Sequence, residues 1–344
     1  MRQRAKKFTL LLAVNALVIG LLFLGFEWYQ RRVDPRHRLP VNGLVGDQFY
    51  TWGHRVVLNG YGFREREFGI SKPPGVYRVM VLGDSLTWGA GLAPQERYTD
   101  LAETYLSRAF PRKKIEVLNC ALPGIATTQQ RDILKEHIDR LQPDRIVVGF
   151  CLNDTQPRSQ YDSVERDAFE RRFGPAMNAL SRWLRGVRLS RTDRLTQHAI
   201  YRSAEVAGVL PRWQVALQRT YEKDSVEWKD FERALQDIKA MSDAAQLAPP
   251  LFSVLNQGTY IDRPTDYRKP DRELKIFLAW YAQAAAAAAA IGFRTYNHAR
   301  EIAEQLPNEI LAVNTDDGHP SARLNQVYAR KLFDMIIRDL QAEN

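Results

Sequence analysis

Val79-Met-Val-Leu-Gly-Asp-Ser-Leu-Thr-Trp-Gly89 decides the fold of this chain of 344 residues. A short apolar run, rich in β-branched residues, ends abruptly in Gly83, Asp84 and Ser85. That pattern predicts a buried parallel strand whose carboxyl end presents a serine hydroxyl, at the edge where open α/β sheets bind their ligands. Serine is a weak nucleophile by itself, so the stretch gains meaning only if the chain also supplies a histidine and an acid.

Strands and helices alternate after this stretch. Further strand-like runs lie at residues 115–118, 145–150, 251–255 and 292–296, and helical patterns lie between and after them. One of these helices carries seven consecutive alanines, Ala284 to Ala290, which favour helix and close packing but have no chemical role. The alternation predicts an α/β domain with a parallel sheet and right-handed crossovers.

The N-terminus carries a different signal. Phe8 to Phe26 is a run of 19 residues whose only polar members are Thr9 and Asn15. As a helix it would be about 28 Å long, close to the thickness of a bilayer core. Four cations precede the run and no small-x-small cleavage site follows it. We therefore expect an uncleaved signal anchor in residues 1–29, with the tail inside and the rest of the chain outside.

Composition is ordinary, with 45% apolar and 26% charged residues, but the net charge of +9 is unevenly distributed. Gln156 to Thr220 holds twelve Arg, no Lys and six acidic residues, so this segment carries two-thirds of the excess. It interrupts the alternation and predicts a helical insertion over residues 156–245. Two interpretations stay open: a solvated helical lid, or a face resting on anionic headgroups or an anionic substrate. A membrane anchor and the lack of a basic-aromatic stacking motif argue against nucleic acid.

The two cysteines do not predict a disulfide. Cys120 and Cys151 each end a strand-like run. If those strands flank the Ser85 strand on opposite sides, they lie about 9–10 Å apart, which is too far to bridge. We expect two free, buried thiols. The chain has no Cys-x-x-Cys or His-Glu-x-x-His pattern, so no metal site or cofactor is predicted.

Three further motifs follow the serine in order. They are Asn119-x-x-x-x-Gly124, Gly149-x-x-x-Asn153-Asp154 and Asp316-Asp-Gly-His319-Pro320. Together with Gly83-Asp84-Ser85, this set resembles the SGNH (GDSL) hydrolase family, and Asn59-x-x-Gly62-Phe-Arg64 resembles its bacterial membrane-anchored members. The resemblance implies a three-layer, flavodoxin-like sandwich with a five-stranded parallel sheet. We expect this domain in residues 76–344, after a linker with short β elements in 30–75.

The resemblance also implies roles for particular residues. Ser85 would be the nucleophile, His319 its base, and Asp316 the acid that orients the histidine, with Asp317 as the alternative acid. The backbone N–H groups of Ser85 and Gly124 and the side-chain amide of Asn153 would form the oxyanion hole. A Gly-x-Ser-x-Gly elbow is broken by Thr87, which argues against an α/β-hydrolase.

These expectations combine into a function. The sequence predicts a serine esterase, anchored in a bacterial inner membrane with its catalytic domain in the periplasm. It would remove an acyl group, acetyl being one candidate, from an envelope glycan or lipid. Two alternatives stay open. An O-acyltransferase would use the same acyl-enzyme, and a non-catalytic envelope protein would use the fold for binding alone.

Overall fold

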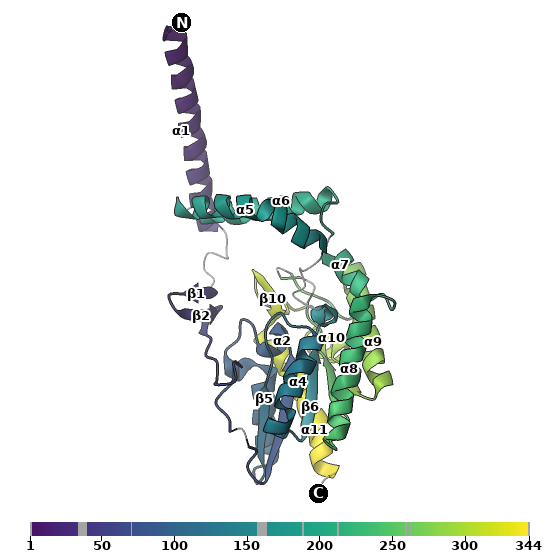
Figure 1. The fold of residues 1–344 in the computed structure, drawn as a ribbon. Coiled ribbons are helices and arrows are strands. Elements are labelled where there is room, and N and C mark those ends of the chain that lie inside the picture. The colour runs from purple at the N-terminus through teal and green to yellow at the C-terminus, as the bar shows by residue number, and fades with distance from the viewer. Residues whose placement is uncertain are drawn as a thin grey trace. The chain divides into compact units, whose positions relative to one another are not determined.

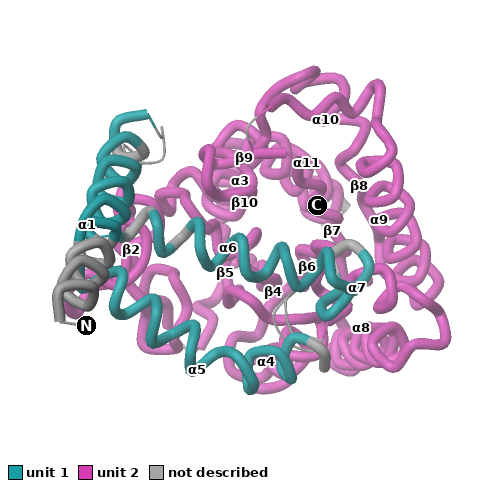
Figure 2. Tube along the Cα trace, turned by 90° about the horizontal axis from the view of Figure 1, so that it is seen from above, with its two compact units in different colours: residues 1–39, 161–216 teal, residues 40–160, 217–344 magenta. Residues whose placement is uncertain are grey.

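The structure, a computed structural model, describes residues 2–33, 40–69, 71–156, 164–187, 189–211, 213–258, 260–261 and 263–342. The chain forms two compact units (Figure 2). The first combines residues 1–39 with 161–216, and the second combines residues 40–160 with 217–344.

A five-stranded parallel sheet forms the centre of the second unit (Figure 1). Its order across the sheet is β5 (Lys114–Asn119), β4 (Val76–Gly83), β6 (Arg145–Phe150), β7 (Leu251–Val254) and β8 (Arg294–Asn297). In chain order this is 2-1-3-4-5, the flavodoxin-like arrangement. The predicted fold class is therefore confirmed, and each strand lies where its apolar run predicts it.

Helices cover both faces of this sheet, as both figures show. On one face α3 (Tyr98–Ala109) packs against α11 (Ala322–Ala342), which also contacts α10 (Ala299–Gln305). On the other face α8 (Val226–Ala244) packs between α4 (Thr127–Leu141) and α9 (Arg272–Ile291). Because both faces are covered, every residue of β4 is buried, which explains its continuous apolar sequence.

The two cysteines lie where the strand order predicts. Cys120 follows β5 and Cys151 follows β6, on opposite sides of β4. Both are buried and free. This part of the sequence analysis is confirmed.

A small antiparallel sheet precedes the domain. It consists of β1 (Gly43–Val45), β2 (Gln48–Thr51) and β3 (His54–Arg55). Trp52 and Gly53 form the two-residue turn between β2 and β3, with φ angles of 46° and 89°. The predicted short β elements of this region thus form a sheet of their own.

The first unit is helical. Its long helix α1 (Arg2–Val33) contains the predicted N-terminal apolar run, and α5 (Val164–Gly186) packs against α6 (Ser190–Val206). Glu27 of α1 accepts hydrogen bonds from the backbone N–H and the hydroxyl of Thr192, at 2.9 and 3.1 Å. A carboxylate at this place caps the first turn of α6 and so ties it to α1.

The Arg-rich insertion divides between the two units. Residues 161–216 belong with α1, whereas 217–245 belong with the sheet. The boundary falls within α7 (Trp213–Thr220). The predicted insertion, 156–245, therefore includes α8, which packs as an ordinary helix of the sandwich.

Within the described residues, one helix is long and apolar enough to cross a membrane, and it is α9. Its mean hydropathy comes largely from the alanine run, and six of its residues are buried in the second unit, among them Leu274, Phe277 and Tyr281. Packing on the sheet accounts for this composition. Within the described part of α1, Leu17–Tyr29 is an apolar stretch.

Candidate active site

Ser85 begins a one-turn helix at the carboxyl end of β4. This helix, α2 (Ser85–Trp88), is capped by Asp84, whose Oδ1 accepts the backbone N–H of Leu86 at 2.9 Å. The other oxygen, Oδ2, accepts the hydroxyl of Ser85 at 3.1 Å. Ser85 is half-buried, so its hydroxyl is held near the surface of the sheet edge.

Thr87 explains why two glycines stand at neighbouring strand ends. Gly83 of β4 is paired with Gly149 of β6, and the Thr87 hydroxyl lies over both. A Cβ on Gly83 would lie 2.1 Å from Thr87 Oγ1, and one on Gly149 would lie 2.4 Å from it. Without side chains at these positions, the turn after β4 can fold back onto the sheet. The hydroxyls of Thr87 and Tyr98 are 3.1 Å apart and share a hydrogen bond.

His319 lies on β10 (Asp317–Pro320), which pairs with β9 (Ala312–Asn314) and contacts α2. Its Nδ1 shares a very short hydrogen bond with Oδ1 of Asp317. The same oxygen accepts the backbone N–H of His319 at 3.0 Å. Asp317 Oδ2 accepts the indole N–H of Trp52 at 2.6 Å. Both carboxylate oxygens of Asp317 therefore accept hydrogen bonds.

The acid that pairs with His319 is thus Asp317, not the preferred Asp316. Asp316 donates its backbone N–H to Asn314 Oδ1 at 2.9 Å. Asp317 faces the histidine because its side chain closes a tight turn onto the N–H two residues later. The geometry favours the alternative acid of the sequence analysis, and it does so through a local turn that residue spacing does not specify.

These contacts shift the pKa values of both partners. Burial alone would raise the pKa of Asp317, but hydrogen bonds and charge from His319, together with the Trp52 indole, lower it to about 2. Burial alone would lower the pKa of His319, yet the hydrogen bond and charge of Asp317 and the charge of Asp84 raise it. The pair therefore stabilises an imidazolium, which a general base must form when it takes a proton.

The predicted oxyanion donors Gly124 and Asn153 follow β5 and β6, the strands on either side of β4. Leu122 donates its N–H to the carbonyl of Gly83 at 3.3 Å, which holds the loop after β5 against the end of β4. Gly124 in that loop is exposed, with a φ of 75°. Asn119 orients the loop by accepting the N–H of Ala121 at 3.2 Å while donating to the carbonyl of Thr87 at 2.6 Å.

Asn153 reaches the serine turn from the other side. It belongs to the short helix η3 (Leu152–Thr155) after β6, and its Nδ2 donates to Asp84 Oδ2 at 3.2 Å. Its Oδ1 accepts the thiol of Cys151 at 2.8 Å. The Asn153 amide and the Ser85 hydroxyl thus share the same carboxylate oxygen, which brings them to one place.

A buried polar cluster lies beneath the serine. Ligand atoms of Asp84, Cys151 and Asp154 lie within 4.8 Å of one another, the one such potential metal-binding group within the described ranges. Burial, and then the charge of Asp84, raises the pKa of Asp154 well above its usual value. Burial likewise raises the pKa of the Cys151 thiol. The Cys151 thiol donates to Asn153 Oδ1 at 2.8 Å, and Asp154 Oδ2 accepts the backbone N–H of Cys151 at 3.1 Å, so hydrogen bonds run through the cluster.

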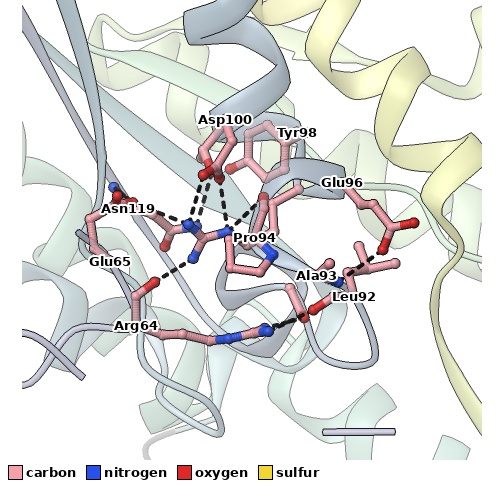
Figure 3. A network of polar contacts seen from close by, with 12 residues as sticks. Arg64, Glu65, Leu92, Ala93, Pro94, Glu96, Tyr98, Asp100 and Asn119 are labelled. Carbon is pink, nitrogen blue, oxygen red and sulfur yellow. Dashed lines mark hydrogen bonds and ion pairs between the residues drawn. The ribbon is translucent and has the colours of Figure 1, made fainter. Parts of the chain in front are cut away.

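Two buried arginines support the far end of the serine helix. Arg64 donates to the carbonyls of Gly89 and Leu92 at 2.8 and 2.6 Å, which caps the chain as it leaves α2 (Figure 3). Arg97 binds Asp100 at 2.8 Å, contacts Glu65 at 3.3 Å, and also donates to the carbonyl of Arg64. The Asn59-to-Arg64 motif therefore acts on the site through the backbone that carries Ser85.

The structure brings together most of the residues that the sequence singled out. Ser85 and Asn153 meet at Asp84, and β10 with His319 contacts α2. The described hydrogen bond of the Ser85 hydroxyl is to Asp84, and that of the His319 ring is to Asp317. Sequence reasoning missed Trp52. The one feature of the sequence that points to it is the Trp52-Gly53 pair, which lies at a turn between two short strands in an otherwise polar region.

Comparison with known proteins gives the family. The model of the GDSL-like lipase/acylhydrolase family matches residues 81–327. Because the match covers most of the chain, the protein belongs to this family. It is an ester hydrolase of the SGNH type.

Similar solved structures are distant. One is the psychrotrophic esterase EstA from Pseudoalteromonas sp., with 17% identity over 77% of this chain and 98% of the other, at a TM-score of 0.40. Another is the acetylxylan esterase Axe2 from Geobacillus stearothermophilus, with 14% identity over 75% and 93%, at 0.42. A third is LAE5, an α/β hydrolase from the metagenome of Lake Arreo, with 13% identity over 74% and 91%, at 0.43. No curated protein sequence gives a significant match to this chain.

Proposed function

We propose that this ester hydrolase is a membrane-anchored serine esterase in which Ser85, His319 and Asp317 form the catalytic triad. The observation that carries the proposal is the hydrogen bond between His319 Nδ1 and Asp317 on β10, the strand that contacts the helix of Ser85. With Nδ1 held by the acid, Nε2 of His319 is the ring nitrogen left to accept the serine proton.

The first half of the reaction forms an acyl-enzyme. His319 Nε2 takes the proton of Ser85 as its Oγ attacks the ester carbonyl carbon, and the carbonyl oxygen becomes an oxyanion. The N–H groups of Ser85 and Gly124 and the amide of Asn153 are the donors proposed to bind that oxyanion. The C–O bond to the alcohol then breaks, and the imidazolium returns its proton to the departing alkoxide.

The second half releases the acid. A water molecule gives a proton to His319 and attacks the acyl carbon, which forms the second oxyanion. Its collapse breaks the bond between the acyl carbon and Ser85 Oγ, and the imidazolium of His319 returns the proton to that oxygen. Asp317 keeps its charge throughout, since its pKa of about 2 lies far below that of the imidazolium. In the resting enzyme the Ser85 hydroxyl is bonded to Asp84, so attack requires it to turn towards His319.

A fluorophosphonate probe tests the triad directly. We expect it to label the full-length protein at one residue, and Ser85→Ala to abolish both labelling and turnover of p-nitrophenyl acetate. Ser71→Ala is a matched control, because Ser71 lies in the exposed segment before β4. Persistent labelling of Ser85→Ala would refute the assignment of the nucleophile.

The membrane anchor rests on α1. Within its described part, apolar side chains are exposed in succession around the helix, as at Leu21, Leu22, Phe23 and Leu24. A helix that is apolar all round is typical of a lipid environment. We propose a single span by Phe8–Phe26, with the catalytic domain on the periplasmic side of a bacterial inner membrane.

The helical pair α5 and α6 belongs beside this anchor. Glu27 lies one residue after the apolar run, and it caps α6 at Thr192. The described part of α5 exposes Phe173, Leu180 and Trp183 among its arginines. That combination suits a face resting on anionic headgroups, the second interpretation of the insertion.

An acyl ester of an envelope glycan or lipid is the proposed substrate, because the anchor would restrict the enzyme to such molecules. Its test uses short- and long-chain aryl esters, with and without a sugar acceptor, on the detergent-solubilised protein. Preference for acetyl esters without acceptor transfer supports the esterase. Transfer of the acyl group to sugar in preference to water would instead identify an O-acyltransferase.

A further inference from the structure

The turn that holds Trp52 has an unfavourable backbone. Thr51 pairs with His54, so Trp52 and Gly53 are the two central residues of a tight hairpin turn, both with positive φ. Such turns favour Asn, Asp or Gly at the first position, and a bulky residue with φ of 46° is an outlier. Conformations of this kind persist where the surrounding contacts hold them, and they are concentrated at functional sites.

Besides bonds to the segment before it, from Trp52 N–H to Asn42 Oδ1 at 3.4 Å and from Gly53 N–H to the carbonyl of Val41 at 2.6 Å, the turn has contacts that lead to the catalytic centre. The indole N–H of Trp52 donates to Asp317 Oδ2 at 2.6 Å. The hydroxyl of the neighbouring Thr51 accepts the N–H of Gly91, in the segment that follows the serine helix, at 2.7 Å. A Cβ on Gly91 would lie 3.2 Å from the Trp52 ring and 2.6 Å from Val313 of β9. The hairpin is therefore packed against both the Ser85 segment and the β9–β10 pair.

We propose that Trp52 is a positioning residue of the triad, which fixes the rotation of the Asp317 carboxylate so that Oδ1 faces His319 Nδ1. The inference rests on the triad of the proposed function and adds a residue to it. A carboxyl group rotates broadly about its last bond. In Asp317 the two donors of His319 hold one oxygen, and the indole is the described donor that holds the other.

This role extends the active site beyond the family domain. The family match begins at residue 81, whereas Trp52 lies upstream, in a hairpin that follows the N-terminal helix in sequence. The indole reaches Asp317 across 265 positions of the chain. The predicted linker, residues 30–75, thus contains a residue that orients the carboxylate paired with His319.

Trp52→Phe in the full-length protein tests the proposal, because it removes the N–H and keeps an aromatic ring. A hydrogen bond to a charged group is worth enough to lower kcat about 10- to 100-fold. We expect KM to change little, since the indole acts on Asp317. The charged groups that face His319 are Asp317 and Asp84. If Asp317 turns away, the pKa of His319 falls. The acid limb of the pH–rate profile, which is the rise in activity as His319 loses its proton, then moves to lower pH.

Two further variants separate positioning from folding. Thr51→Val disturbs the same hairpin at Gly91 but leaves the indole in place, so its acid limb should stay at the wild-type pH. Trp52→Asn relieves the turn, because Asn accepts positive φ, while its side chain is too short to reach Asp317. It should therefore melt no lower than wild type yet lose activity as Trp52→Phe does. The low-field proton resonance of the His319–Asp317 hydrogen bond should broaden or disappear in both Trp52 variants.

Three results would overturn the inference. They are wild-type kcat in Trp52→Phe, a loss of kcat that only follows the fraction of protein labelled by a fluorophosphonate, and an acid limb that stays or moves to higher pH. The proposed function is tested separately by Ser85→Ala. If that variant stays active, the triad fails; if it is inactive while Trp52→Phe matches wild type, only the positioning role fails.

Discussion

Asp317→Asn, compared with Asp316→Asn, is the sharpest test of how the histidine is prepared. An amide has one acceptor oxygen, whereas the Asp317 carboxylate accepts from His319 N–H and Nδ1 through one oxygen and from Trp52 through the other. If the amide oxygen faces His319, its NH₂ group meets the indole N–H. If it faces Trp52, the NH₂ group meets the two donors of His319 and favours the tautomer that carries its proton on Nε2.

Either orientation damages the base. In the tautomer with a proton on Nε2, His319 cannot accept the proton of Ser85. Replacing a triad aspartate by Asn in the chymotrypsin template lowers kcat by about 10⁴, equivalent to about 5 kcal/mol. We expect a loss of this order, about 10³- to 10⁴-fold, for Asp317→Asn. Asp316→Asn should lose less than about tenfold.

The assay is turnover of p-nitrophenyl acetate per labelled active site, measured across pH. Because the Asp317 charge raises the pKa of His319, its removal should also move the acid limb to lower pH. A collapse of activity in Asp316→Asn, with Asp317→Asn near wild type, would refute the reasoning and restore the acid preferred from the sequence.

Three other outcomes follow from the same contacts. In the wild-type enzyme, activity should rise with pH through a midpoint above the usual histidine value of about 6.5, because the pKa of His319 is raised and the base must be neutral; a midpoint below 6 would contradict this. Asn153→Ala should lower kcat about 100- to 1000-fold with little change in KM, as expected for the loss of one oxyanion donor; a pure KM effect would contradict that role. Arg64→Met should lower the free energy of unfolding by about 2–5 kcal/mol, since it leaves the buried carbonyls of Gly89 and Leu92 without this donor. Arg66→Met is its control, expected to cost about 1 kcal/mol or less because Arg66 is 43% exposed; equal losses in urea denaturation would show that Arg64 has no special role.

The sheet, and the edge of it at which Ser85, Asn119 and Asn153 meet, could be predicted because their signals are local. A strand buried on both faces is a continuous apolar run, and the residue that follows it must lie at the carboxyl edge. Ser85, Asn119 and Asn153 each end or follow such a run, so their meeting at one edge follows from strand order. The glycines at the ends of β4 and β6 are also local features: Gly83 and Gly149 pair beneath Thr87, where neither position has room for a Cβ.

The choice between Asp316 and Asp317 depends on backbone geometry that the sequence does not display. Both residues precede His319 closely enough to reach it. Two consecutive turns, each closed by a side chain, determine which acid faces the ring. Asn314 Oδ1 accepts the backbone N–H of Asp316, and Asp317 Oδ1 accepts the backbone N–H of His319. The second turn brings the Asp317 carboxylate alongside the ring, at a place where the pairing of β9 and β10 is irregular. An acid two residues before the histidine can therefore pair with it, whereas the family pattern places the acid three residues before.

Trp52 could not be predicted for a different reason, which concerns the range of the contact. Local patterns report which face of a strand or helix is buried, but they do not report which distant backbone a turn will touch. The one local hint is a conflict: Trp occupies a turn position that suits Asn or Gly, and it is stabilised there by Asp317, 265 positions away. A residue that violates its local preference marks a place where a tertiary contact determines the conformation. In this chain the residue with that conflict, Trp52, lies outside the family domain and is hydrogen-bonded to Asp317, the proposed acid of the triad.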